Sequence, residues 1–84
     1  MYYVYLLKSL SDRGWYTGFT EDINRRFEDH NFGKNVSTRA RRPFVLIYYE
    51  EYLYKLDALG REKFLKSGSG KRFLEKQLRH YLSP

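Results

Sequence analysis

Apolar residues gather in short runs along the first half of the chain. Residues 2–8 form an aromatic and apolar run rich in strand formers, residues 9–14 hold the Ser, Asp and Gly of a turn, and residues 15–19 are again aromatic. This pattern predicts a β-hairpin with a loop of about five or six residues. Residues 44–52 form a later apolar run, which predicts a third strand.

Helical spacing begins directly after the predicted hairpin. Thr20 and Asp22 offer side-chain oxygens that can cap a helix, and Ile23 and Phe27 recur at positions i and i+4. Gly33 marks the expected end, because glycine commonly terminates helices. The segment therefore predicts a helix of about three turns.

The second half of the chain predicts two more helices. Residues 34–43 form a basic loop before the third strand, and residues 56–66 carry helix formers interrupted only by Gly60. Residues 67–71 read as a glycine-rich connection, and apolar residues from 74 to 81 predict a last amphipathic helix. The order β-β-α-β-α-α predicts an α+β domain with a small sheet covered by helices.

The length of the chain bounds its architecture. With 84 residues it is expected to form a single domain, residues 1–84, with no deep enclosed cavity and any site as a shallow surface groove. The chain has no cysteine, which excludes disulfides and cysteine-bound zinc and agrees with a cytoplasmic protein. The apolar run at residues 1–7 is too short for a membrane span, so neither an anchor nor a signal peptide is expected.

Charge and aromatic content indicate a polyanionic partner. Sixteen Lys and Arg against ten Asp and Glu give a net charge of +6, and the chain holds nine Tyr and six Phe. This combination suits nucleic acid, with cations for phosphates and rings for bases. The alternative is that the rings build the core, and for Trp15 and the aromatic residues of the third strand packing is favoured over stacking on bases.

One face of the first predicted helix carries candidate chemistry. Asp22, Arg26 and His30 follow one another at intervals of four, beside the apolar stripe of Ile23 and Phe27. Arg26 and His30 are therefore expected at the edge of the buried face, within reach of the sheet. The alternative is a surface ion pair between Asp22 and Arg26 with little energetic weight.

An acidic residue stands among apolar positions of the second predicted helix. Ala58, Glu62 and Leu65 share one face at i, i+4 and i+7. Burying a carboxylate is costly without a compensating cation, so Glu62 is expected to have a partner. That partner is either Arg26, in a structural pair, or a divalent metal such as Mg²⁺ or Mn²⁺, and the spacing leaves both open.

Many of these residues belong to one ordered pattern that spans most of the chain. It consists of Tyr3-Val4-Tyr5, Tyr16-Thr17-Gly18, Thr20, Asp22, Ile23, Arg26, Phe27, His30 and Glu62. The pattern resembles the GIY-YIG nuclease domain, and in particular the small stand-alone bacterial proteins that carry it. Gly18 is the glycine of the second signature segment.

The resemblance implies a phosphodiesterase site on one face of a three-stranded antiparallel sheet. Tyr5 and Tyr16 would stand side by side, one of them accepting a proton from the attacking water or orienting it. Arg26 would stabilise charge on the phosphate, and Glu62 would hold a single divalent metal, Mg²⁺ or Mn²⁺. His30 matches a histidine of the family that assists.

The resemblance leaves two functions open. The first is a metal-dependent endonuclease, acting on DNA rather than RNA, with weak sequence specificity or with recognition of substrate structure. The second is a nucleic-acid-binding module that has the fold but little catalysis. The second stays open because the chain has no asparagine beyond Asn35, whereas many active members carry one after the glutamate.

Basic segments flank the candidate site residues. Lys34, Arg39, Arg41 and Arg42 fall within the loop before the third strand and are expected to contact phosphates beside the site, with Lys71 and Arg72 extending the patch. The alternative for the loop is a solvated charge cluster. The stretch GSGK at residues 68–71 does not fit a nucleotide-binding P-loop, because Arg72 stands where that motif requires Ser or Thr.

Overall fold

The computed structural model describes all residues, 1–84. Three strands, four α-helices and one 3₁₀ turn follow one another along the chain. In order they are β1 (Tyr2–Ser9), β2 (Trp15–Thr20), α1 (Ile23–Asn31), the 3₁₀ turn (Arg39–Arg41), β3 (Phe44–Tyr52), α2 (Lys55–Leu65), α3 (Gly68–Gln77) and α4 (Arg79–Leu82). None of the helices combines the length and the apolar composition needed to cross a membrane.

The strands form one antiparallel sheet in the order β2-β1-β3. The central strand β1 pairs with both neighbours, so that Tyr5 lies opposite Gly18 on β2 and opposite Tyr49 on β3. This confirms the α+β fold with a three-stranded antiparallel sheet. It also places the two signature segments on adjacent strands.

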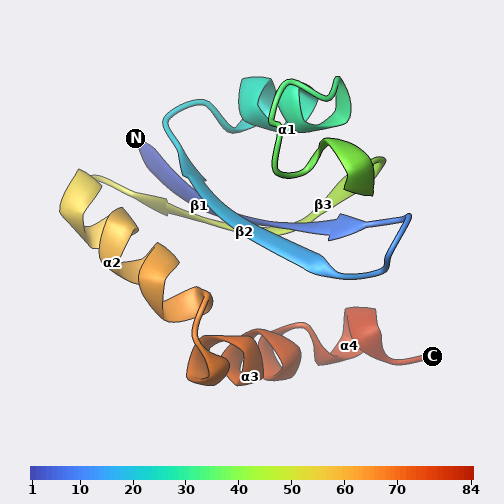
Figure 1. Cartoon of the computed structure of the whole chain (residues 1–84). Helices are drawn as coiled ribbons and strands as arrows, with labels where there is room; N and C mark the ends of the chain where they lie inside the picture. The colour runs from blue at the N-terminus through green and yellow to red at the C-terminus, as the bar shows by residue number, and fades with distance from the viewer.

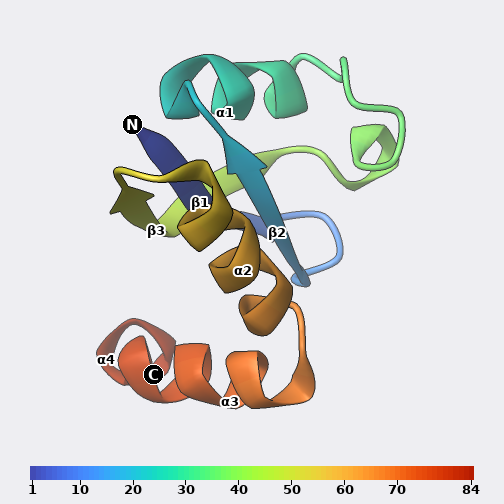
Figure 2. The same ribbon diagram turned by 90° about the vertical axis from the view of Figure 1, so that its left-hand side faces the viewer.

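Helices cover both faces of the sheet. Figure 1 shows α1 above the sheet and α2 with α3 below it, and the view in Figure 2 agrees. Because side chains of a strand alternate between faces, Val4 and Leu6 pack toward α2 and α3, whereas Tyr5 and Leu7 pack toward α1. The candidate tyrosines therefore belong to the α1 side of the sheet.

Helix α2 is fastened to β3 by a partly buried polar contact. Arg61 donates two hydrogen bonds to the carboxylate of Glu50, at 2.8 and 3.0 Å, and the hydroxyls of Tyr48 and Tyr52 donate to the same carboxylate. Burial opposes ionisation of Glu50, but these four donors outweigh it and lower its pKa. The contact sets the position of α2, and with it that of Glu62, the residue after Arg61.

The prediction that residues 67–71 form a connection is wrong, because helix α3 already begins at Gly68. The side chain of Ser67 caps this helix by accepting a hydrogen bond from the backbone N–H of Gly70. Gly70 also faces the end of α2, and a Cβ atom there would fall 1.9 Å from the carbonyl oxygen of Phe64. The glycines predicted a loop, whereas Gly70 serves a close contact between two helices.

Candidate active site

Tyr5 and Tyr16 lie side by side around His30. The ring centroids of the two tyrosines are 6.3 Å apart, and the ring of His30 meets that of Tyr16 edge-on at 4.9 Å. Tyr5 is only 2% exposed, whereas Tyr16 is half-buried and borders a surface groove. The sequence prediction that these residues meet is confirmed, but their access to solvent differs.

Gly18 makes room for the Tyr5 side chain. A Cβ atom at position 18 would lie 2.3 Å from the hydroxyl oxygen of Tyr5, far inside van der Waals contact. The side chain of Tyr5 therefore passes over β2 at Gly18, the one residue of that strand that has no side chain. The close approach of Tyr5 to β2 depends on this absence of a side chain.

A chain of hydrogen bonds holds the Tyr5 hydroxyl. It lies 2.9 Å from Nε2 of His30, while Nδ1 of His30 lies 2.8 Å from the hydroxyl of Thr38. Thr38 donates to the carbonyl oxygen of Asn35 at 3.4 Å, so it accepts from Nδ1–H. This network assigns the Nδ1–H tautomer to His30, and Tyr5 donates its proton to Nε2.

Burial keeps this pair neutral. It raises the pKa of Tyr5 to about 12, although the nearby Arg26 guanidinium acts in the opposite direction. Burial also lowers the pKa of His30, and the positive charge of Arg26 adds to that effect. At neutral pH Tyr5 is therefore a hydrogen-bond donor and His30 an uncharged acceptor.

Arg26 brings an unpaired donor to the same place. Its Nε is buried and has no hydrogen-bond partner in the protein. The guanidinium lies close enough to the Tyr5 oxygen for that oxygen to raise the pKa of Arg26, but the two do not form a hydrogen bond of good geometry. Arg26 also borders a hollow of 410 Å³ together with His30 and Lys34.

The ion pair considered for Arg26 at the sequence level is not formed. Asp22 instead accepts a hydrogen bond from the backbone N–H of Arg25 at 3.1 Å and caps helix α1. The sequence predicted that Asp22 could cap this helix. Because its carboxylate caps the helix, Asp22 does not hold Arg26, which faces Tyr5. Arg25 is exposed, on another side of the helix.

Glu62 stands on α2, which covers the opposite face of the sheet from α1 (Figure 1). Its carboxylate contributes to the raised pKa of Tyr5, so its charge acts on the same cluster. Its ion-pair partner, however, is Lys66, whose Nζ lies 3.0 Å from Oε2, and not Arg26. Lys66 stands one turn further along the same helix, whereas the guanidinium of Arg26 is turned toward Tyr5.

The donor set fits a metal that the substrate helps to bind. The chain has no group of three or more His, Cys, Asp or Glu residues arranged to hold a metal ion. Mg²⁺ is commonly bound by one or two carboxylates together with waters and substrate phosphates. Glu62, a hard oxygen donor whose side chain is 20% exposed, fits the role of that single carboxylate.

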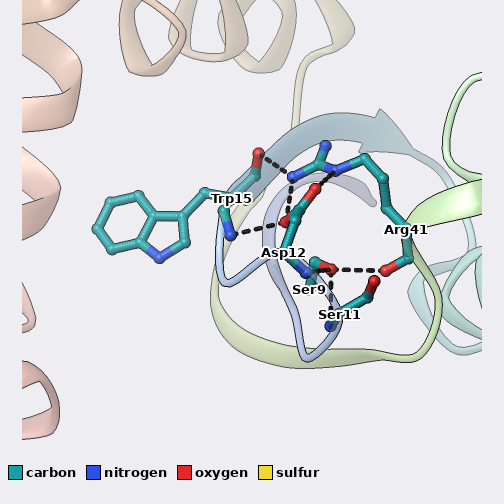
Figure 3. Close-up of polar contacts among 6 residues, drawn as sticks. Ser9, Ser11, Asp12, Trp15 and Arg41 are labelled. Carbon is teal, nitrogen blue, oxygen red and sulfur yellow. Dashed lines mark hydrogen bonds and ion pairs between the residues drawn. The ribbon is translucent and has the colours of Figure 1, made fainter.

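The arginines of the loop before β3 mostly bind the protein itself. Arg41 donates to the carboxylate of Asp12 at 2.6 Å and to the carbonyl oxygen of Trp15 at 3.3 Å (Figure 3). Arg41, with the backbone N–H of Gly14, lowers the pKa of Asp12 to about 2. Arg41 thus ties the loop to the β1–β2 hairpin.

Other basic residues divide between two sides of the sheet. The Nε atoms of Arg39 and Arg42 donate to the carbonyl oxygens of Gly33 and Arg39, at 2.9 and 2.8 Å. Lys34 pairs with Asp29 at 3.5 Å and remains exposed. Lys71 and Arg72 lie on α3, across the sheet from this loop, so they do not extend its patch (Figure 1).

Two residues of the site were missed by the sequence reasoning. Thr38 is fully buried and contacts His30, but it stands in a loop where no periodicity identifies it. Lys66 could have been found, because it follows Glu62 at the i, i+4 interval of a helix.

Comparisons with known proteins agree on one family. A family model described as the GIY-YIG catalytic domain matches residues 1–77. UPF0213 proteins from Staphylococcus aureus strains Mu3 and Mu50 are each 43% identical over 67 residues, covering 79% of this chain and 80% of the relative. The solution NMR structure of a UPF0213 protein from Bacillus halodurans is 37% identical with a TM-score of 0.57, covering 92% of this chain and 85% of that one.

Proposed function

Since the chain belongs to the GIY-YIG family, we propose that it is a metal-dependent endonuclease that hydrolyses phosphodiester bonds in nucleic acid, DNA rather than RNA. Cleavage would take place in the cytoplasm, with weak sequence specificity or with recognition of substrate structure. One observation carries the proposal. The buried Nε of Arg26 lacks a partner beside the neutral Tyr5–His30 pair, as expected of a donor reserved for an anion.

The phosphate would be bound by Arg26. A guanidinium can donate two parallel hydrogen bonds to phosphate oxygens, and at this depth such contacts are strong. Tyr5 would act as a positioning residue, because its proton is held by His30 and its oxygen faces Arg26. His30 and Thr38 would keep that orientation fixed.

Tyr16 would contact the attacking water. It is the more accessible of the two tyrosines and stands where the site opens into the groove, whereas Tyr5 is buried. The hydroxyl oxygen of Tyr16 would accept a hydrogen bond from the attacking water and so orient the water oxygen toward phosphorus. The products would carry a 5′ phosphate and a 3′ hydroxyl.

Glu62 would hold the metal ion. A bound Mg²⁺ or Mn²⁺ supplies Lewis-acid stabilisation of charge on the phosphate and the leaving oxygen. Lys66, the present partner of the carboxylate, would be released to meet the negative substrate.

A panel of labelled duplex, branched and single-stranded substrates tests the proposal. Wild-type protein with Mg²⁺ or Mn²⁺ is expected to cut at least one of them, and Glu62→Gln to bind it without cutting. Glu28→Gln, a matched change on the exposed side of α1, serves as the control against contaminating nucleases. Binding without cleavage by the wild type under every metal would instead support the alternative of a nucleic-acid-binding module.

A further inference from the structure

A groove of about 520 Å³ lies on the face of the sheet that α2 and α3 cover. It runs between the edge strand β2 and the helices α2 and α3. Trp15, Leu65 and Leu74 are among its apolar lining residues. Leu65 and Leu74 are also buried in the core, so the floor of the groove belongs to the rigid part of the fold.

The rim of this groove is basic. Arg13, Lys66 and Lys71 line it, against a single carboxylate, that of Glu75. Arg13 and Lys71 form no ion pair within the protein, unlike Arg41 of the loop, which is paired with Asp12. An excess of unpaired cations over an apolar floor is complementary to a phosphate backbone that carries bases or sugars.

Two residues that line the groove also contact residues of the candidate active site. Tyr16 lines the groove and also contacts His30. Lys66 lines the groove and also pairs with Glu62 at 3.0 Å. A strand that lies in the groove therefore runs along β2 past Tyr16 and meets Lys66, the partner of the proposed metal carboxylate.

We propose that this groove, and not the basic loop, binds the sugar–phosphate backbone of the substrate strand that flanks the cleaved bond. The inference rests on the proposed function for the identity of its ligand. Lys71 and Arg13 contact phosphates, and Lys66 moves between Glu62 and the phosphate next to the metal. Trp15 and Tyr16 pack against the strand.

Trp15 offers a direct readout, because it is the one tryptophan of the chain and it lines the groove. Figure 3 shows its indole pointing away from Asp12 and Arg41 of the loop contact. A short DNA duplex is titrated into the protein in EDTA, which prevents cleavage. The quenching of Trp15 emission by acrylamide is followed together with the anisotropy of a label on the DNA.

Bound DNA is expected to shield Trp15 from acrylamide. Lys71→Ala should weaken binding about three- to tenfold and reduce the slope of log K against log salt by about 0.9, as for one lost phosphate contact. The matched control is Lys76→Ala, an exposed lysine on the same helix outside the groove, which should change neither quantity. Circular dichroism of each variant confirms that the fold is retained.

Two results would overturn the inference. One is binding, seen by anisotropy, that leaves Trp15 as accessible to acrylamide as in the free protein. The other is a loss of affinity in Arg39→Ala or Arg42→Ala that exceeds the loss in Lys71→Ala. Failure of the proposed catalysis is distinguished from both, since the titration requires no cleavage.

Discussion

The hydroxyl of Tyr5 donates its proton to Nε2 of His30 across 2.9 Å, within a cluster that excludes solvent from both residues. A buried tyrosine whose proton is already engaged is a poor acceptor for the proton of a water molecule. Its oxygen instead faces Arg26. The two signature tyrosines therefore have different surroundings, although they are the same residue type on adjacent strands.

This difference predicts unequal effects of the same substitution. Tyr16→Phe should lower kcat by about 10²–10⁴, the usual range for loss of a group that assists proton transfer. Tyr5→Phe should mainly raise KM, because Arg26 loses its support and binds phosphate less well. Steady-state kinetics of both variants check this, with Tyr3→Phe as the control on the same face of β1. Equal losses of kcat in Tyr5→Phe and Tyr16→Phe would refute the division of tasks.

Thr38 should fix the tautomer of His30. Thr38→Val removes the acceptor for Nδ1–H, so the Nδ1–H tautomer should lose its preference and stability should fall by about 1–3 kcal/mol, as for an unsatisfied buried donor. Thr38→Ser keeps the hydroxyl and should retain the tautomer. The ¹⁵N chemical shifts of His30 measure the tautomer directly. Unchanged shifts in Thr38→Val would show that the hydroxyl has no such role.

The ion pair between Asp12 and Arg41 should make the stability of the fold depend on pH in the acid range. Asp12 has a pKa of about 2 in the folded protein, below its ordinary value of 3.8. A lowered carboxyl pKa stabilises the fold above the ordinary value, and that contribution disappears as the pH falls toward about 2. Asp12→Asn should therefore have a lower Tm than the wild type at neutral pH. The gap should close between about pH 4 and pH 2, and a gap independent of pH would contradict the assignment.

Two helical glycines should respond in opposite ways to alanine. Gly70→Ala places a methyl group 1.9 Å from the carbonyl oxygen of Phe64 and should cost about 1–3 kcal/mol or more, because α3 must move away from α2. Gly60 has no atom within 4 Å of a built Cβ, so Gly60→Ala should stabilise the protein by about 0.5–1 kcal/mol. Chemical denaturation of the two variants measures both values. A stabilised Gly70→Ala would show that the helices do not pack as closely as described.

Local patterns predicted most of the fold. The apolar run at residues 44–52 predicted β3 with its observed bounds, and Asp22 was identified as a possible cap of the helix that it begins. The run of glycines after Ser67 misled the prediction, because the sequence does not reveal whether a glycine serves a turn or a close approach of two helices. Gly70 serves the second purpose, and only the packing of α3 on α2 shows it.

The site was predictable where helical spacing governs it. Arg26 and His30 lie one helical turn apart, and both face the tyrosines. Thr38 was not predictable, because its contact with His30 depends on how the loop folds back over α1. The loop arginines were assigned to phosphates from their charge and from the position of the loop beside the candidate site. Carbonyl oxygens and Asp12 are competing acceptors inside the protein, and charge counts do not include them.

The absence of a side chain at Gly18 gives a criterion for the Tyr5 geometry that can be applied to the sequence of a relative. Because a single methyl group there would occupy the place of the Tyr5 hydroxyl, a chain of this family cannot keep both a side chain at this position and the Tyr5 arrangement. A relative that has a larger residue than glycine opposite its first signature tyrosine is therefore expected to lack this geometry.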